Sequence, residues 1–145
     1  MKNFLNEAIK EAKKALKENE VPIGAVIVCD GKIISKGHNQ REKKQNAIKH
    51  AEIIAIEKAC KKLSSWRLDG CEIYVTLEPC PMCAGAIANA RIKKLVYGAK
   101  DKSSEDNLCE KILSSTRLNH KVAIEIEENE KCSKILTDFF KEKRQ

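Results

Sequence analysis

The sequence predicts an α/β fold in which one mixed, five-stranded sheet is flanked by about five helices in three layers, α/β/α. Apolar residues at helical spacing alternate along the chain with short β-like runs, which is the pattern of strands connected by helices. The 145 residues are enough for one sizeable core, and they contain no linker and no internal repeat. We therefore expect a single domain over residues 1–145.

The first part of the chain is expected to form a helix and then a hairpin. Apolar residues recur at helical spacing over residues 3–18, with Lys and Glu on the other face. Two β-like runs follow at residues 23–29 and 32–36. Asp30 and Gly31 between them are a strong signal for a tight hairpin turn.

Helices and strands are expected to alternate beyond this hairpin. A polar, basic loop over residues 37–45 leads to a second helix at about 50–63, where apolar side chains return at helical spacing. Residues 71–77 have the pattern of a third strand. Pro81 is a residue favoured in the first turn of a helix, and it opens an Ala-rich helix that ends at about residue 90.

The last part of the chain continues this alternation. A fourth strand is expected at residues 92–97, a short helix near 106–115, and a fifth strand at 122–126. A final helix from about residue 129 carries apolar side chains on one face. The short helix before the fifth strand favours a sheet that is mostly parallel after the opening hairpin, including its last two strands.

Composition limits the class of protein. The chain carries 28 basic and 21 acidic residues, a net charge of +7, which is basic enough to attract a polyanion. Its longest uninterrupted apolar stretch, residues 23–29, is far shorter than the roughly 20 residues of a membrane span. Residues 1–20 mix apolar residues with Lys and Glu, so they lack the apolar segment of a secretory signal. We therefore expect a cytoplasmic protein whose seven cysteines are reduced.

Two short motifs each place potential metal ligands at the start of a predicted helix. His50-Ala51-Glu52 opens the second helix, and the run from Pro79 to Cys83 opens the third. Cys80 and Cys83 alone are a weak signal, because a zinc ribbon needs a second such pair and a thioredoxin-like redox pair also fits a strand-to-helix junction. One His with two Cys supplies three protein ligands for a tetrahedral zinc ion whose fourth position is open to water.

Glu52 is expected to have a different part from His50. Positions i and i+2 of a helix point roughly 200° apart, so Glu52 should not bind the same metal in the same way. A carboxylate beside the metal-activated water can take a proton and pass it to a leaving group. This combination suits hydrolytic attack on an amidine-like ring carbon with loss of ammonia.

The other cysteines and the single tryptophan are expected to have structural roles. Five cysteines lie on strands or on apolar helix faces and are expected to be small buried side chains: Cys29, Cys60, Cys71, Cys109 and Cys132. Trp66 and Arg67, between the second helix and the third strand, are expected to anchor packing.

The motif H-x-E followed by P-C-x-x-C is identified as the signature of zinc-dependent nucleobase deaminases. The surrounding residues resemble the bacterial tRNA-specific adenosine deaminases of the cytidine deaminase superfamily. The matching runs are residues 21–26, 37–39, 50–52, 77–86, 91–92, 97–99, 119–120 and 139–140.

This resemblance implies a cytidine-deaminase-like fold, a homodimer, one zinc ion per chain, and conversion of adenosine to inosine at the wobble position of a tRNA anticodon. It also implies three sets of site residues: the zinc ligands His50, Cys80 and Cys83; the proton shuttle Glu52; and the substrate contacts Ile23, Asn39, Ala51 and Asp101. An anticodon stem-loop suits such an enzyme, because its bases are largely free to leave the stack.

Charge placement favours the same substrate, whereas two segments leave other substrates open. From Lys36 to Lys49 there are five basic residues and one acidic residue, directly before His50, which favours phosphate contact. Residues 46–49 replace a run close to Asp-Pro-Thr-Ala in the family, and residues 101–108 lack the family's glycines. Deamination of a free nucleobase or nucleoside (guanine, cytosine or cytidine) is the alternative, and a dithiol redox protein or a zinc-stabilised binding module is the rival from another class.

Overall fold

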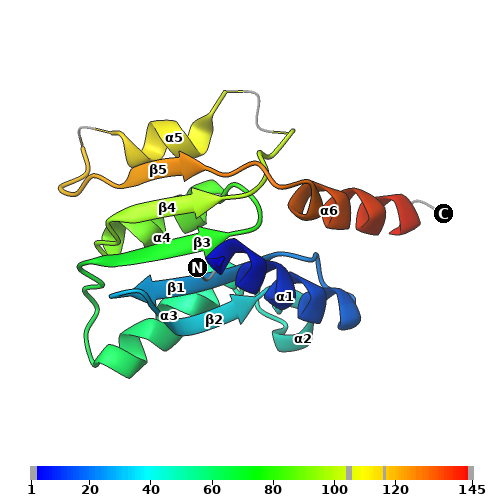
Figure 1. Cartoon of the computed structure of the whole chain (residues 1–145), viewed down its shortest axis with the longest axis horizontal. Coiled ribbons are helices and arrows are strands. Elements are labelled where there is room, and N and C mark those ends of the chain that lie inside the picture. The colour runs from blue at the N-terminus through cyan, green and yellow to red at the C-terminus, as the bar shows by residue number, and fades with distance from the viewer. Residues whose placement is uncertain (1–2, 104–105, 116, 144–145) are drawn as a thin grey trace.

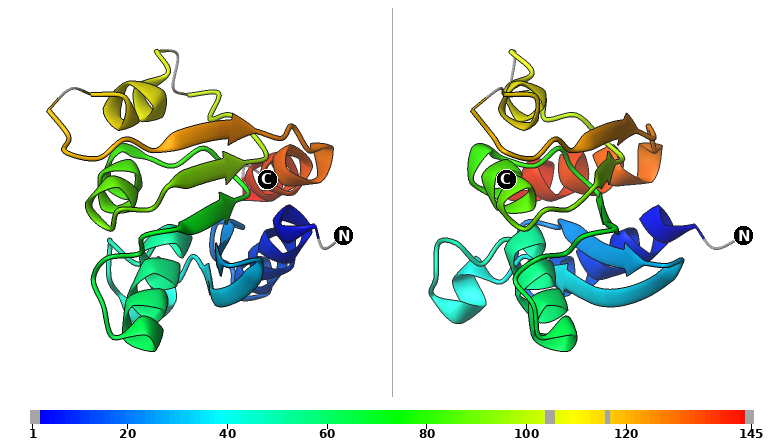
Figure 2. Two further views of the ribbon diagram at one scale, coloured as in Figure 1. Left: turned by 60° about the vertical axis from the view of Figure 1, so that its left-hand side comes forward. Right: turned by 90° about the vertical axis from the view of Figure 1, so that its left-hand side faces the viewer.

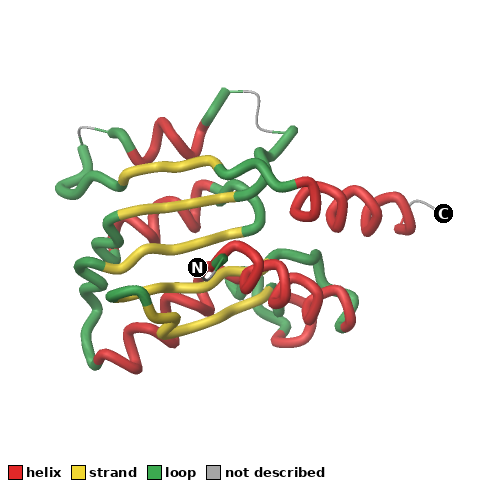
Figure 3. The backbone as a smooth tube through the Cα atoms, viewed as in Figure 1, coloured by secondary structure: helices red, strands yellow, loops and turns green. Residues whose placement is uncertain are grey.

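The computed structural model describes residues 3–103, 106–115 and 117–143 (Figures 1 and 3). In chain order these residues form α1 (Phe4–Lys17), β1 (Gly24–Cys29), β2 (Lys32–His38), α2 (Arg41–Lys44), α3 (Ala51–Leu63), β3 (Cys71–Val75), α4 (Pro81–Asn89), β4 (Lys94–Tyr97), α5 (Leu108–Leu113), β5 (Ala123–Ile126) and α6 (Glu130–Lys143). Every predicted helix and strand is present, with ends that differ by a few residues.

The five strands form one mixed sheet in the order β2-β1-β3-β4-β5. β1 is antiparallel to both of its neighbours, whereas β3, β4 and β5 are parallel to one another, as predicted for the last two strands. The pairing of β1 with β3 is antiparallel, and the two later pairings are parallel, in agreement with the expectation of a mostly parallel sheet after the hairpin. The connection through α3 brings the chain back in the direction of β2, so β3 runs parallel to β2. β3 does not pair with β2, however; it pairs with β1, on the side of β1 away from β2.

Helices cover both faces of the sheet, which confirms the three-layer α/β/α arrangement (Figure 2). α1 and the start of α6 pack on one face, where a small apolar core contains Leu5, Ile9, Val26 and Cys132. α3, α4 and α5 pack on the other face over the larger core. The residues expected to bind metal lie on this second face, at the start of α3 and α4.

The described residues contain six helices, one more than expected. The extra helix, α2, is four residues long and lies in the segment predicted to be a loop. Its first backbone amides, those of Glu42 and Lys43, donate to the carboxylate of Glu20 at 3.2 and 2.8 Å. The acceptor for the free backbone N–H groups at the start of α2 therefore comes from a distant part of the chain. Local sequence patterns do not indicate such a contact.

Two glycines set the first hairpin and its contact with α3. Asp30 and Gly31 both have positive φ, 52° and 74°, which is the geometry of the predicted two-residue turn. A Cβ at Gly37 would lie 2.5 Å from the backbone oxygen of Ala51. Only glycine lets the first turn of α3 approach β2 this closely, and that approach brings the start of α3 against Asn39.

All seven cysteines are free thiols. Cys71, Cys109 and Cys132 are buried as predicted, and burial raises their pKa values to about 12, 12 and 11. Cys29 and Cys60 are half-buried and pack against the larger core. None of the helices in the described part of the chain combines the length and the apolar character that a membrane crossing requires.

Candidate metal centre

Three potential metal donors meet where α3 and α4 begin. His50 is the N-cap residue of α3, Cys80 is the N-cap residue of α4, and Cys83 lies in the first turn of α4. The Nδ1 atom of His50 is 3.8 Å from the Sγ atom of Cys80 and 3.6 Å from that of Cys83. All three donor atoms lie within 4.8 Å of one another.

These distances fit a tetrahedral zinc ion. Zn–S bonds of about 2.3 Å and Zn–N bonds of about 2.0–2.1 Å place an imidazole nitrogen about 3.6 Å from a thiolate sulfur in tetrahedral geometry. The two His50 distances, 3.6 and 3.8 Å, match that spacing. A dithiol redox pair has no need of an imidazole nitrogen near both sulfurs, so the arrangement favours a metal site with one open position.

The electrostatics of the two thiols differ. Hydrogen bonds from the Cys83 thiol and from His50 lower the pKa of Cys80 to about 4, whereas the Cys80 thiolate and burial raise the pKa of Cys83. The Cys80 thiolate in turn raises the pKa of His50. The protein groups alone therefore hold one thiolate and one thiol, and a divalent metal would displace the second proton.

Glu52 lies in the first turn of α3, and only 4% of its surface is exposed. Burial raises the pKa of its carboxyl to about 7, although the nearby His50 and the Cys83 thiol act in the opposite direction. Glu52 is not part of the three-donor group. A carboxyl that titrates near neutral pH can both accept and donate a proton during a reaction.

The raised pKa of Glu52 leads to a prediction about stability. Between pH 4.5 and 7 the folded state holds a proton on Glu52 that the unfolded state has lost, so stability falls as pH rises through this window. At 1.36 kcal/mol per pKa unit, the cost above pH 7 is about 3 kcal/mol. We expect metal-stripped Glu52→Gln to be more stable than wild type at pH 8 by up to about that amount, with the difference shrinking toward pH 5. Urea unfolding at pH 5, 6.5 and 8 measures it, and a difference independent of pH would contradict the buried-carboxyl origin.

Three of the expected substrate contacts come together beside His50. Asn39 is buried, and its Oδ1 atom accepts a hydrogen bond from the backbone N–H of Ala51 at 2.8 Å. The backbone N–H of Asn39 donates to the carbonyl of Ile23 at 3.3 Å. These contacts hold Ile23, Asn39 and Ala51 as one unit at the N-terminal end of α3.

Asp101, the fourth expected substrate contact, lies near Cys80 instead. Both residues line a cavity of about 270 Å³ that is also bordered by Glu78, Pro81 and Leu108. The Asp101 carboxylate accepts hydrogen bonds from the backbone N–H and the hydroxyl of Ser103 at 3.0 and 2.6 Å. The Asp101 side chain therefore forms hydrogen bonds within its own loop and stabilises the turn there.

Sequence reasoning missed the residue that holds this loop. Glu78 is buried, and its Oε1 atom accepts a hydrogen bond from the backbone N–H of Asp101 at 3.1 Å. The available signal was the position of an acidic residue between an apolar strand and Pro79-Cys80, where the chain runs into the metal site.

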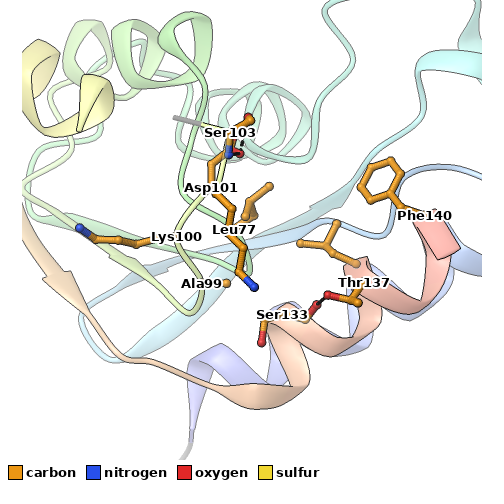
Figure 4. A pocket seen from close by; sticks show the side chains of 10 residues that line it. Leu77, Ala99, Lys100, Asp101, Ser103, Ser133, Thr137 and Phe140 are labelled. Carbon is orange, nitrogen blue, oxygen red and sulfur yellow. Dashed lines mark hydrogen bonds between the residues drawn. The ribbon is translucent and has the colours of Figure 1, made fainter. Parts of the chain in front are cut away.

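A cavity of about 390 Å³ lies next to the Asp101 loop and is bounded on the other side by α6 (Figure 4). In Figure 4 the Asp101 and Ser103 side chains border this space from the loop, and Thr137 and Phe140 border it from α6. Phe140, which lines this cavity, is exposed to 47%.

Sequence comparison relates the chain to curated proteins of similar length. The tRNA-specific adenosine deaminase of Bacillus subtilis (strain 168) is 48% identical over 143 residues, which cover 97% of this chain and 89% of that protein. The tRNA-specific adenosine deaminase of Aquifex aeolicus (strain VF5) is 45% identical, and the alignment covers 97% of this chain and 94% of that protein. The chain belongs to the family of tRNA-specific adenosine deaminases.

Other comparisons relate the chain to deaminases more widely. The family model of the MafB19-like deaminases matches residues 1–144. A structure from biochemical and structural studies of A-to-I editing by tRNA:A34 deaminases superposes with a TM-score of 0.84 at 39% identity, covering 92% of this chain and 98% of that one. The guanine deaminase of Bacillus subtilis superposes with a TM-score of 0.65 at 43% identity, covering 69% of this chain and 66% of that one.

Two segments were expected to distinguish this chain from other tRNA-specific adenosine deaminases. In residues 46–49, the Oδ1 atom of Asn46 accepts from the backbone N–H of Ile48 at 3.1 Å, which forms a local turn directly before His50. In residues 101–108, the turn at Asp101 is described, whereas Ser104 and Glu105 lie outside the described residues.

Proposed function

We propose that the protein hydrolyses adenosine to inosine at the wobble position of a tRNA anticodon, using one zinc ion per chain. The observation that carries the proposal is a set of three donors at tetrahedral spacing with a buried, proton-exchanging carboxyl, Glu52, beside them. The relatives named tRNA-specific adenosine deaminase and the tRNA:A34 deaminase structure support this substrate class.

The residues of the site divide the chemistry among them. His50, Cys80 and Cys83 would hold the zinc ion, which when bound supplies a nucleophile at neutral pH by lowering the pKa of water to about 7. Glu52 accepts a proton from the water as it adds to carbon 6 of the adenine ring. Glu52 delivers this proton to ring nitrogen N1 and then carries the proton of the added hydroxyl to the amino nitrogen, which leaves as ammonia, so adenosine and water become inosine and ammonia.

Asn39 is the side chain that we propose to orient the base. Its amide oxygen already accepts from the Ala51 N–H, which leaves the amide nitrogen as the donor offered to an acceptor on the ring. Because both partners are buried, the amide cannot rotate to exchange these two atoms without losing a hydrogen bond. Ile23 and Ala51 would line the same pocket.

The basic segment before His50 is proposed to contact RNA phosphates. Lys36, Lys43 and Lys49 each form an ion pair with a glutamate. Arg41 and Lys44 have no carboxylate partner among the described residues, and the charge of Arg41 acts on the pKa of His50. These two cations are therefore the ones available to a phosphate near the reacting nucleotide.

We also propose a homodimer that acts in the cytoplasm, where its tRNA substrate is found. Met82 at the start of α4 and Leu108 at the start of α5 are each exposed to 37%, so apolar surface lies beside Cys80. A second copy of the chain would cover this surface. The mass in solution, measured by light scattering, tests this part.

The test of function compares substrates. We expect ammonia release from an anticodon stem-loop that carries adenosine at the wobble position, and none from free adenosine, guanine or cytidine. Added salt should lower kcat/KM for the stem-loop steeply, and Arg41→Ala should make the slope of log kcat/KM against log salt shallower by about one. Turnover of guanine without turnover of the stem-loop would instead favour the function of the guanine deaminase whose structure is similar.

A further inference from the structure

A basic and aromatic cluster lies at the edge of the sheet opposite the metal centre. We use the name far-edge cluster for Trp66, Arg67, Arg91, Arg117 and His120. They belong to the connections that precede β3, β4 and β5, whereas Cys80 follows β3. Because these three strands are parallel, the connections meet at one edge, separated from the metal centre by on the order of 17 Å, the length of a five-residue strand.

Three members of the cluster, Arg91, Arg117 and His120, line a small cavity of about 140 Å³. Its polar lining comes from Asn89, Arg91, Arg117, Asn119 and His120, and among the described residues no carboxylate contributes to it. At about 30 Å³ for each water in the liquid, this space holds four or five waters. It therefore has room for one tetrahedral oxyanion. The guanidinium and amide groups of this lining supply hydrogen-bond donors, as an oxyanion requires.

Arg91 is held in place before any ligand binds. Its backbone has a positive φ of 65°, and one terminal nitrogen of its guanidinium donates to the carbonyls of Ala88 and Asn89 at 3.1 and 3.4 Å. The same guanidinium lies 5.7 Å from the centre of the Trp66 ring. A side chain fixed by several contacts loses little entropy when it binds an anion.

The local charge is positive. Asp69 is ion-paired with Arg67 at 2.9 Å, and Arg67 lowers the pKa of Asp69, as do the charges of His120 and Arg91. The Arg117 side chain has no carboxylate partner among the described residues. The Nε2 atom of His120 lies 2.7 Å from the carbonyl oxygen of Ile92, so this nitrogen carries the proton and donates.

Trp66 does not pack as the sequence predicts. Its surface is 60% exposed, and the guanidinium of Arg67 lies 5.3 Å from its ring centre. An exposed indole beside arginines is typical of surfaces that stack on nucleobases next to bound phosphates. The expectation of a packing anchor is wrong, because the ring contacts arginine side chains at the surface and lies outside the apolar core.

We propose that the far-edge cluster is a phosphate-binding site, occupied by the backbone of the tRNA outside its anticodon loop, with Trp66 stacking on an adjacent base. This inference rests on the proposed function for its substrate. The phosphate site itself stands on the cavity and its charges. It would give full-length tRNA a second contact that a short anticodon hairpin cannot reach.

The single tryptophan of the chain makes a direct test possible, because its fluorescence reports on this cluster alone. Zinc-loaded wild type is titrated with inorganic phosphate and with full-length tRNA at constant ionic strength. We expect saturable changes with both. Arg117→Ala should weaken both responses about tenfold, whereas Lys111→Ala, which removes one exposed positive charge from α5 outside the cavity, should leave them unchanged.

Kinetics provide the second measurement. Arg117→Ala should raise KM for full-length tRNA, leave kcat unchanged, and leave both constants unchanged for a short anticodon stem-loop. If wild type gives no saturable response to phosphate, the phosphate site is overturned. If it responds to phosphate but not to tRNA, the proposal that tRNA occupies the site is overturned. A shift of the monomer–dimer equilibrium in Arg117→Ala would assign the cluster to a subunit contact and overturn the proposal. Wild type that fails to deaminate tRNA but still responds to phosphate would contradict the proposed function and leave the phosphate site standing.

Discussion

Glu52→Gln should lower kcat for an anticodon stem-loop by about 10²–10⁴-fold, the contribution typical of a positioned acid–base group. Glutamine occupies nearly the same volume as glutamate but can neither accept the proton of the attacking water nor return it to the departing amino group. The carboxyl is buried, so bulk solvent has little access to the position from which it transfers the proton. KM should change little, because binding of the base does not require the proton transfer.

Two measurements make this result specific. Zinc content should stay at one per chain, because Glu52 does not belong to the three-donor group. Glu57→Gln, an exposed position on the same helix that pairs with Lys49, should retain wild-type kcat. A Glu52→Gln protein that holds zinc and keeps its full rate would show that the proton travels by another route.

The sequence predicted the elements of the fold well, because each has a local signal. The apolar periodicity of α1, the Asp30-Gly31 turn and Pro81 at the start of α4 all act through neighbours in the chain. The antiparallel pairing of β1 with β3 and the helix α2 have no such signal. The pairing of β1 with β3 depends on the side of β1 at which the chain rejoins the sheet after α3. The helix α2 depends on the carboxylate of Glu20, which is distant in sequence.

The same distinction applies to the site. His50, Cys80 and Cys83 are recognisable because a metal demands particular atoms, and such residues are few in a chain with only three histidines. The structure brings these three together, and it joins Ile23, Asn39 and Ala51 by hydrogen bonds that were not predicted. Glu78 and the exposed Trp66 were missed or misassigned, because burial depends on tertiary contacts that an isolated motif does not encode.

Cys83→Ala should remove both the metal and the activity. With two of three protein ligands left, we expect less than a tenth of the zinc content of wild type after dialysis against a chelator. Activity should fall by more than about 10³-fold, because water loses the activation that makes it a nucleophile at neutral pH. Atomic absorption and ammonia release from the stem-loop measure the two quantities on one preparation.

A matched variant separates the loss of a ligand from the loss of a buried sulfur. Cys109→Ala removes a thiol that is equally enclosed, at 2% exposure against 0% for Cys83, but one that lies outside the three-donor group. It should lose some stability through the cavity it leaves, and it should keep its zinc and its kcat. If Cys83→Ala instead retained one zinc per chain, the metal would be held by other residues. If neither the variants nor wild type bound zinc while wild-type activity responded to dithiol oxidation, Cys80 and Cys83 would form a redox pair, and the His50 nitrogen at 3.6–3.8 Å from both sulfurs would have no metal to bind.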